Sequence, residues 1–168
     1  MKLLFAAELV FVGAILLICV VFSFINRRKR PGHVTYSLNH LLTATLVPLV
    51  SNLVVVVTPE QFIAEICYLF YLVGLNLFAY MLLAFIMDFC EIKYRGSRYK
   101  TLITLLVLVN TASLCLNPFF HHVFVVKPDY FPNGDLFFVV ESNFGRYLNF
   151  AVVVFVVCIS IQVLIVRM

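Results

Sequence analysis

The sequence predicts an all-α integral membrane protein, in which five transmembrane helices form one bundle with a short extracellular β-hairpin between the fourth and fifth helices. Composition is the first reason. Of the 168 residues, 64% are hydrophobic and only 12% are charged, and the mean hydropathy is +1.08. Soluble domains are roughly 45–50% apolar and about 25% charged. The second reason is the recurrence of long apolar runs separated by short basic clusters, which indicates that lipid is the main solvent.

A window of about 20 residues, the length that crosses a hydrocarbon core of about 30 Å, locates the spans. We expect one transmembrane module over 1–168, with an outer loop at 117–143 and helices at about 3–25, 38–57, 61–89, 101–116 and 144–166. The first apolar run is too long for a signal peptide and a stop-transfer cluster follows it, so it should remain as an anchor. The third helix is about 45 Å long at 1.5 Å per residue, so it must tilt or project from the membrane.

Local signals support the second and third helices. Thr58 is expected to cap the third helix, Pro59 suits its first position, and Gln61 completes a capping box. Pro48 is expected to kink the second helix, and Gly74 should let a neighbouring backbone approach the third.

The loop after the fourth helix has the pattern of a β-hairpin. The runs 123–127 and 136–140 are β-branched and aromatic, and residues 128–135 between them are rich in turn formers. Two strands alone are marginally stable in water, so the hairpin is expected to pack on the helix ends or on a partner.

The distribution of lysine and arginine gives the orientation. Nine basic residues fall on one side of the predicted bundle and three on the other, and the richer side faces the cytoplasm. The N-terminus is therefore expected outside and the C-terminus in the cytoplasm. The cluster Arg27, Arg28, Lys29 and Arg30 is a topology signal that can also attract anionic lipid headgroups. Because the basic residues lie between apolar runs rather than along one face, no nucleic-acid binding is expected.

Polar residues within the spans are energetically costly and are the candidates for function. On the third helix, residues 65, 68, 72, 76 and 80 follow helical spacing, so they share a face that is expected to look into the bundle. The candidate signal-facing or ligand-facing residues are Glu8, Asn52, Glu65, Tyr68, Asn76, Tyr80 and Asn110.

Two uses of these polar residues stay open. Asn76 is expected either to form interhelical hydrogen bonds or to line a ligand cavity, with partners on the second and fourth helices: Ser51, Asn52, Asn110, Thr111 and Ser113. Such bonds average about 0.6 kcal/mol, and a structural role is favoured. Glu8 and Glu65 lie near outer helix ends, where reaching the headgroup zone is favoured over a shared cavity.

The sequence carries no catalytic constellation, because a glycine-rich phosphate loop, HExxH and GxSxG are all absent. We therefore expect no enzyme activity in this chain and no cofactor. The five cysteines lack CxxC spacing and are expected to be small buried hydrophobes. Asp88 and Glu91 are expected to form ion pairs with Lys93 and Arg95.

His121 and His122 are candidate metal ligands, together with the outer acidic residues Asp129, Asp135 and Glu141. Adjacent side chains point to opposite faces of a strand and diverge by about 100° on a helix, so joint ligation is disfavoured. A pH-sensing role for the pair stays open, because histidine is the side chain that changes charge near physiological pH.

The order of these parts resembles the N-terminal seven-transmembrane sensor region of bacterial histidine kinases and diguanylate cyclases. The segment 117–124, with Asn117, His121, His122 and Phe124 as markers, is similar to the family's Asn, His-His, aromatic pattern. Residues 134–138 are similar to the Gly-x-aromatic stretch that precedes the family's fifth helix. The family continues with two more helices and a PAS, kinase or GGDEF output domain, so we expect either a fragment or a stand-alone module.

The resemblance implies a sensory input module of the bacterial inner membrane that detects an extracellular or membrane-borne signal. Its expected partners are the lipid bilayer and either a second copy of the chain or a cytoplasmic output domain. The resemblance does not identify the signal ligand. It also implies no catalytic residues in this region. Two other classes stay open. A small transporter or channel subunit predicts paired ionisable groups near mid-membrane. A membrane-assembly partner predicts a dominant small-residue motif, and no GxxxG occurs.

Overall fold

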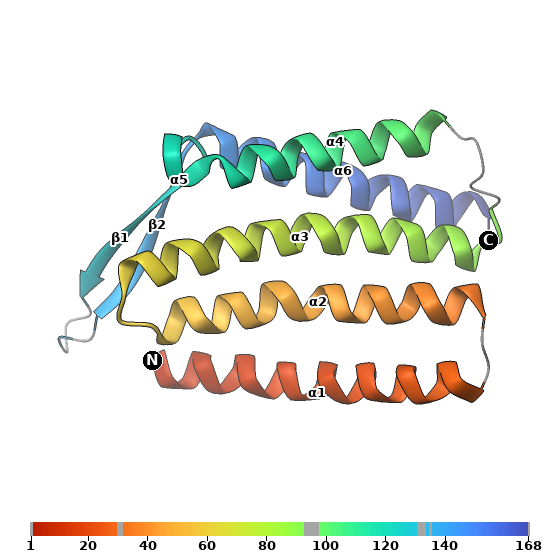
Figure 1. The fold of residues 1–168 in the computed structure, drawn as a ribbon, viewed down its shortest axis with the longest axis horizontal. Coiled ribbons are helices and arrows are strands. Elements are labelled where there is room, and N and C mark those ends of the chain that lie inside the picture. Colours follow the sequence, from red (N-terminus) through yellow and green to blue (C-terminus); the bar gives the residue numbers. More distant parts are fainter. Residues whose placement is uncertain (1, 30–31, 93–97, 131–133, 135, 168) are drawn as a thin grey trace.

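The computed structural model describes residues 2–29, 32–92, 98–130, 134 and 136–167. Three long antiparallel helices lie side by side in chain order: α1 (Lys2–Lys29), α2 (His33–Val57) and α3 (Gln61–Phe89). On the far side of α3 lie α4 (Arg98–Cys115) and α6 (Phe144–Arg167) (Figure 1). Between α4 and α6 come the single turn α5 (Asn117–Phe120) and the strands β1 (Phe124–Tyr130) and β2 (Leu136–Ser142).

The two strands lie at one end of the bundle, called here the hairpin end. Helix α1 begins at the hairpin end and α6 ends at the opposite end (Figure 1). The last turn of α1, which holds Arg27 to Lys29, therefore lies far from the hairpin. Arg30 lies outside the described residues.

In the part of the chain that the structure describes, four helices are long and apolar enough to cross a membrane, which is consistent with a membrane protein. They are Ala6–Asn26 within α1, and the whole of α2, α3 and α6. The fourth predicted span, 101–116, is present as a helix but falls short. Helix α4 has 18 residues, about 27 Å, and its apolar part, Thr101–Cys115, is shorter still. The prediction of five spans is thus confirmed for four helices, and the helix at 101–116 does not meet the length of about 20 apolar residues that a span needs.

Several helix ends differ from the predicted bounds. Helix α1 continues to Lys29, and α2 already begins at His33 rather than at residue 38, whereas α3 has the predicted limits. The predicted capping box is wrong. Thr58 Oγ1 accepts a hydrogen bond from the Glu60 N–H at 3.2 Å, but the Gln61 side chain turns to the hairpin, where its Nε2 donates to the Val126 carbonyl at 2.8 Å.

Helices α2 and α3 make the most extensive helix pair, and the two backbones lie close together at Gly74. A Cβ atom added there would lie 2.7 Å from Pro48 Cδ and 2.9 Å from Pro48 N. Helix α2 runs through Pro48 without a break. Gly74 therefore has the role predicted for it, since a missing side chain lets two helix backbones come together in lipid.

The hairpin is antiparallel, with Phe124 opposite Ser142 and Tyr130 opposite Leu136. Its strands are longer than the predicted runs 123–127 and 136–140, and Pro128 to Tyr130 belong to β1 rather than to the turn. A two-stranded sheet has only edge strands, where a proline without an N–H is tolerated. Residues 131–133 and 135 of the predicted turn lie outside the described residues.

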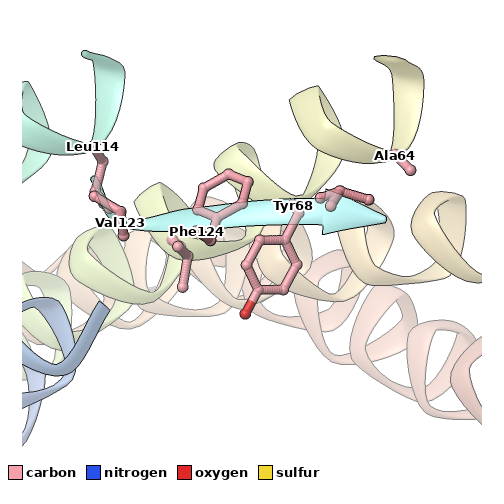
Figure 2. Packing of buried hydrophobic residues seen from close by; sticks show 7 residues of the cluster. Ala64, Tyr68, Leu114, Val123 and Phe124 are labelled. Atoms are coloured by element: carbon pink, nitrogen blue, oxygen red, sulfur yellow. The ribbon is translucent and has the colours of Figure 1, made fainter. Parts of the chain in front are cut away.

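The hairpin packs on the helix ends, as predicted. Its first strand lies against α3, and the second touches α2 and α6. Figure 2 shows the Tyr68 ring of α3 beside Phe124 of β1; the ring centroids are 4.8 Å apart at 72°, the edge-to-face geometry that aromatic pairs prefer. The buried cluster comprises Ala64, Tyr68, Leu72, Leu114, Val123, Phe124 and Val126.

Candidate functional site

Three asparagines from three helices meet in the interior of the bundle, in what we call the asparagine triad: Asn76 on α3, Asn110 on α4 and Asn149 on α6. The Asn76 Nδ2 donates to Asn149 Oδ1 at 2.9 Å. The Asn110 Nδ2 donates to Asn76 Oδ1 at 2.9 Å and to Asn149 Oδ1 at 2.8 Å. Asn76 and Asn149 are fully buried. The bonds satisfy both polar atoms of the Asn76 amide and the Oδ1 of Asn149, which apolar surroundings would otherwise penalise, whereas the Asn149 Nδ2 has no partner among the described residues.

The predicted polar face of α3 does look into the bundle. Tyr68, Leu72 and Asn76 are buried, and Glu65 and Tyr80 are half-buried. The Tyr80 hydroxyl lies 3.3 Å from Thr104 Oγ1 on α4, a second polar link between these helices.

The structure does not bring all the candidate residues together. Asn52 is half-buried on α2, and the hydrogen bonds of the triad do not include it. Glu8 is exposed on α1, and α2 lies between α1 and α3, so Glu8 does not share a site with Glu65 (Figure 1). Asn149 was not among the residues predicted from the sequence. It could have been found in the same way as Asn76, because each is an amide side chain within an apolar span.

Asn117 joins the end of α4 to the start of β1. Its side chain is completely buried. The Oδ1 atom accepts hydrogen bonds from the N–H groups of Val123 at 2.8 Å and Phe124 at 3.2 Å, and Nδ2 donates to the Phe124 carbonyl at 3.1 Å. Asn117 is therefore one of the residues that hold the start of the hairpin to the bundle, together with Gln61 and Tyr68 of α3.

The adjacent histidines have different partners. His121 adopts the left-handed conformation with φ 49° and ends α5, and its Nδ1 lies 3.5 Å from Glu65 Oε1. His122 Nε2 lies 2.9 Å from Ser113 Oγ on α4. Within the described ranges, no group of three or more His, Cys, Asp or Glu side chains is placed to hold a metal ion. Glu141 instead pairs with Lys127 across the hairpin at 2.7 Å.

Arg146 connects the start of α6 with the hairpin and α3. Its guanidinium carbon lies 5.6 Å from the centre of the Tyr68 ring and 5.5 Å from that of Phe150, and it also donates to Ser142 Oγ. Both distances fit cation–π contacts. The guanidinium of Arg146 therefore lies on the side of α6 that carries Phe150 and faces Tyr68 of α3.

At the opposite end of the bundle, Asp88 on α3 accepts a hydrogen bond from Ser37 on α2. Its predicted partners Lys93 and Arg95 lie outside the described residues. Cys19, Cys115 and Cys158 are exposed, contrary to the expectation that the cysteines are buried. A thiol behaves as a small hydrophobe, so it needs no burial on a helix surrounded by lipid.

A groove of about 390 Å³ lies between α4 and α6 beside the triad, and we call it the α4–α6 groove. Its lining is Leu106, Val109, Asn110, Ser113, His122, Phe144, Gly145, Leu148 and Val152. A second groove of about 300 Å³ separates α4 from α3 and includes Tyr80, Thr104 and Thr111. Helix α4 thus has a groove on either side, and it is held by polar contacts together with the buried apolar side chains Ile103 and Leu114.

Comparisons with protein-family models, with curated proteins and with solved structures find no match.

Proposed function

We propose that this chain is the membrane-embedded sensory input module of a bacterial signal-transduction protein of the histidine kinase or diguanylate cyclase type. It detects an extracellular or membrane-borne signal and passes it to a cytoplasmic output domain. One observation carries the proposal: two separate groups of side-chain hydrogen bonds lie along α4 and the turn that follows it, one at the hairpin and one among the helices that run to the opposite end. Asn117, in the turn α5 directly after α4, binds Phe124 at the start of β1, and the asparagine triad binds α4 to α3 and α6.

Helix α4 is the element that shifts in this mechanism. Its polar contacts are made by Thr104, Asn110 and Ser113, its buried apolar contacts by Ile103 and Leu114, and the two grooves beside it leave it room to move. Hydrogen bonds between membrane helices average about 0.6 kcal/mol, so exchanging a few of them costs little. A signal that binds one packing of α4 better than the other shifts the population of the two, and the difference reaches the far ends of α3 and α6.

The triad is uncharged, which favours this function over transport. A transporter or channel subunit is expected to carry paired ionisable groups near mid-membrane. In the part of the chain that the structure describes, the pair Glu65 and His121 lies at the hairpin end instead.

A fusion protein tests the proposal without knowledge of the signal. The full chain is joined after its last helix to a cytoplasmic diguanylate cyclase domain, and cyclic di-GMP is measured in a bacterial host. Replacement of residues 124–142 by a short glycine-serine linker, and Asn76→Leu, are each expected to change the output several-fold. Asn52→Leu is the matched control, because Asn52 lies outside the triad and should leave the output unchanged. Equal output from all four proteins at equal membrane levels would contradict a sensory function.

Orientation is tested separately by thiol labelling in a background without native cysteines. Tyr130→Cys on the hairpin is expected to react with an impermeant maleimide in intact cells, since Tyr130 is exposed. Glu91→Cys, exposed at the opposite end, should react only after permeabilisation. The reverse pattern would place the hairpin in the cytoplasm and exclude it as a receiver of extracellular signals.

A further inference from the structure

The α4–α6 groove is open to the surface of the bundle, and its lining is mostly apolar with a few polar side chains. Ligand pockets usually have volumes of about 300–1,000 Å³ and are mostly apolar with a few converging polar groups, and this groove of about 390 Å³ fits that description. Its polar residues Asn110, Ser113 and His122 lie toward the hairpin end, whereas Leu106 and Val152 line the deeper part.

The groove opens between two apolar helix surfaces. Val109, Phe144 and Leu148 on its rim are 61%, 75% and 51% exposed. Because α6 has the length and composition of a membrane span, this opening faces hydrocarbon in a bilayer. A ligand therefore enters from the membrane.

The polar groups select the head group of that ligand. Both N–H bonds of the Asn110 amide donate within the triad, which leaves its Oδ1 as an acceptor for a hydroxyl group. Ser113 Oγ and His122 Nε2 share one hydrogen bond, and the serine oxygen retains capacity for another. The hydroxyl of a ligand would thus find both an acceptor and a second polar partner at one end of the groove.

Among the described residues that line the groove there is no lysine or arginine, so a carboxylate or phosphate would lack a permanently charged partner there. Arg146 directly follows the lining residue Gly145 in the chain, but it is not part of the lining. Its guanidinium lies against the rings of Tyr68 and Phe150 instead. An unpaired ionic head group in an apolar groove is strongly disfavoured.

We infer that the α4–α6 groove binds a neutral, single-chain amphiphile from the membrane, of the class of a long-chain alcohol. The hydroxyl lies at Asn110 and Ser113, and the aliphatic chain lies along Leu106, Leu148 and Val152. Binding would place the ligand beside α4, the helix that shifts in the proposed sensory mechanism. The role of the ligand as the signal rests on the proposed function, whereas the binding of the ligand to the groove does not.

The absence of tryptophan from the chain provides a clean assay. A single tryptophan is introduced on the groove rim as Val109→Trp, or on lipid-facing α1 as Phe22→Trp, a position that is 68% exposed. The full-length variants in lipid nanodiscs are titrated with bromododecanol, whose bromine quenches tryptophan at short range. Saturable quenching of the groove reporter is expected at a several-fold lower membrane fraction than that of the α1 reporter. Bromododecane and the anionic bromododecanoate should quench both reporters alike.

Two further variants separate the site from bulk lipid. Val152→Phe fills the groove and should abolish the saturable phase, whereas Val154→Phe, on the exposed surface of α6 outside the lining, should preserve it. Ser113→Ala removes one hydrogen-bonding group and should weaken binding of the alcohol about fivefold, in line with a typical single hydrogen bond.

The wild-type chain gives an independent readout, since dodecanol should raise its unfolding temperature and dodecane should not. Equal quenching of both reporters by the alcohol, with no such thermal shift, would overturn the site. Stronger binding of the alkane or the carboxylate would overturn the head-group assignment. A silent fusion protein with intact alcohol binding would reject the sensory function alone, and an active fusion without binding would reject this ligand class alone.

Discussion

The contact between Gly74 and Pro48 gives a sharp test of how α2 and α3 pack. In Gly74→Ala the new Cβ would lie 2.7 Å from Pro48 Cδ and 2.9 Å from the Pro48 backbone nitrogen. Ordinary carbon–carbon contacts are about 3.5–4.0 Å, so the two helices must separate by roughly 1 Å. A proline ring and backbone cannot rotate away, and the strain falls on the helix pair.

The size of the effect follows from two opposing terms. Overpacking of a well-packed interior costs typically about 1–3 kcal/mol. Alanine in place of a helical glycine returns about 1 kcal/mol or less through its better helix propensity. A net loss of about 1–2 kcal/mol is therefore expected for Gly74→Ala.

Gly13 provides the matched control. It is also a glycine within a long apolar helix, but its added Cβ would meet only the Leu49 Cδ2 atom at 3.2 Å, the tip of a flexible side chain. Gly13→Ala should therefore be neutral or slightly stabilising. Unfolding of the detergent-solubilised variants by sodium dodecyl sulfate, followed by circular dichroism, measures both changes. If Gly74→Ala proved as stable as Gly13→Ala, the close approach of α2 to α3 would be refuted.

Three further predictions concern the polar groups. Asn149→Leu leaves the Nδ2 groups of Asn76 and Asn110 without their shared acceptor. It should therefore lower the free energy of unfolding by about 1–3 kcal/mol. If the loss were no greater than that of the control Asn52→Leu, the triad would not contribute to stability. Asn117→Ala removes three hydrogen bonds from the hairpin, so amide exchange at 123–126 should accelerate at least tenfold by mass spectrometry, and unchanged exchange would separate hairpin stability from Asn117. Tyr68→Phe should be neutral or slightly stabilising in the same unfolding assay, because the buried hydroxyl has no partner within the described residues, and a clear loss would reveal one.

Much of the helical layout could be predicted because lipid imposes one simple rule on the chain. Each span must be apolar for about 20 residues, and composition alone therefore located α2, α3 and α6. The face of α3 that carries Tyr68 and Asn76 followed from helical spacing, since polar groups in a span turn away from lipid. These inferences need no knowledge of the neighbouring helices.

The partners of the polar groups could not be predicted in the same way. Helical spacing predicts which face of α3 carries Asn76, but not which helix lies opposite that face. From the sequence, Asn52 and Asn149 were therefore equally possible hydrogen-bond partners of Asn76. The Gln61 side chain fits a capping box locally, yet the tertiary contact with Val126 of the hairpin prevails. Pro128 signals a turn, and only the two-stranded form of the sheet makes a strand position acceptable for it.

The short α4 has a consequence for the surrounding bilayer. Helix α3 has 29 residues, about 44 Å, whereas α4 has 18, about 27 Å. Hydrophobic mismatch of this kind is relieved when the bilayer thins or flanking residues reach toward the headgroups. The membrane beside α4 is therefore expected to be thinner than the membrane beside α1. This asymmetric thinning of the bilayer brings headgroups close to the opening of the α4–α6 groove. It also makes the position of α4 relative to α3 and α6 depend on bilayer thickness.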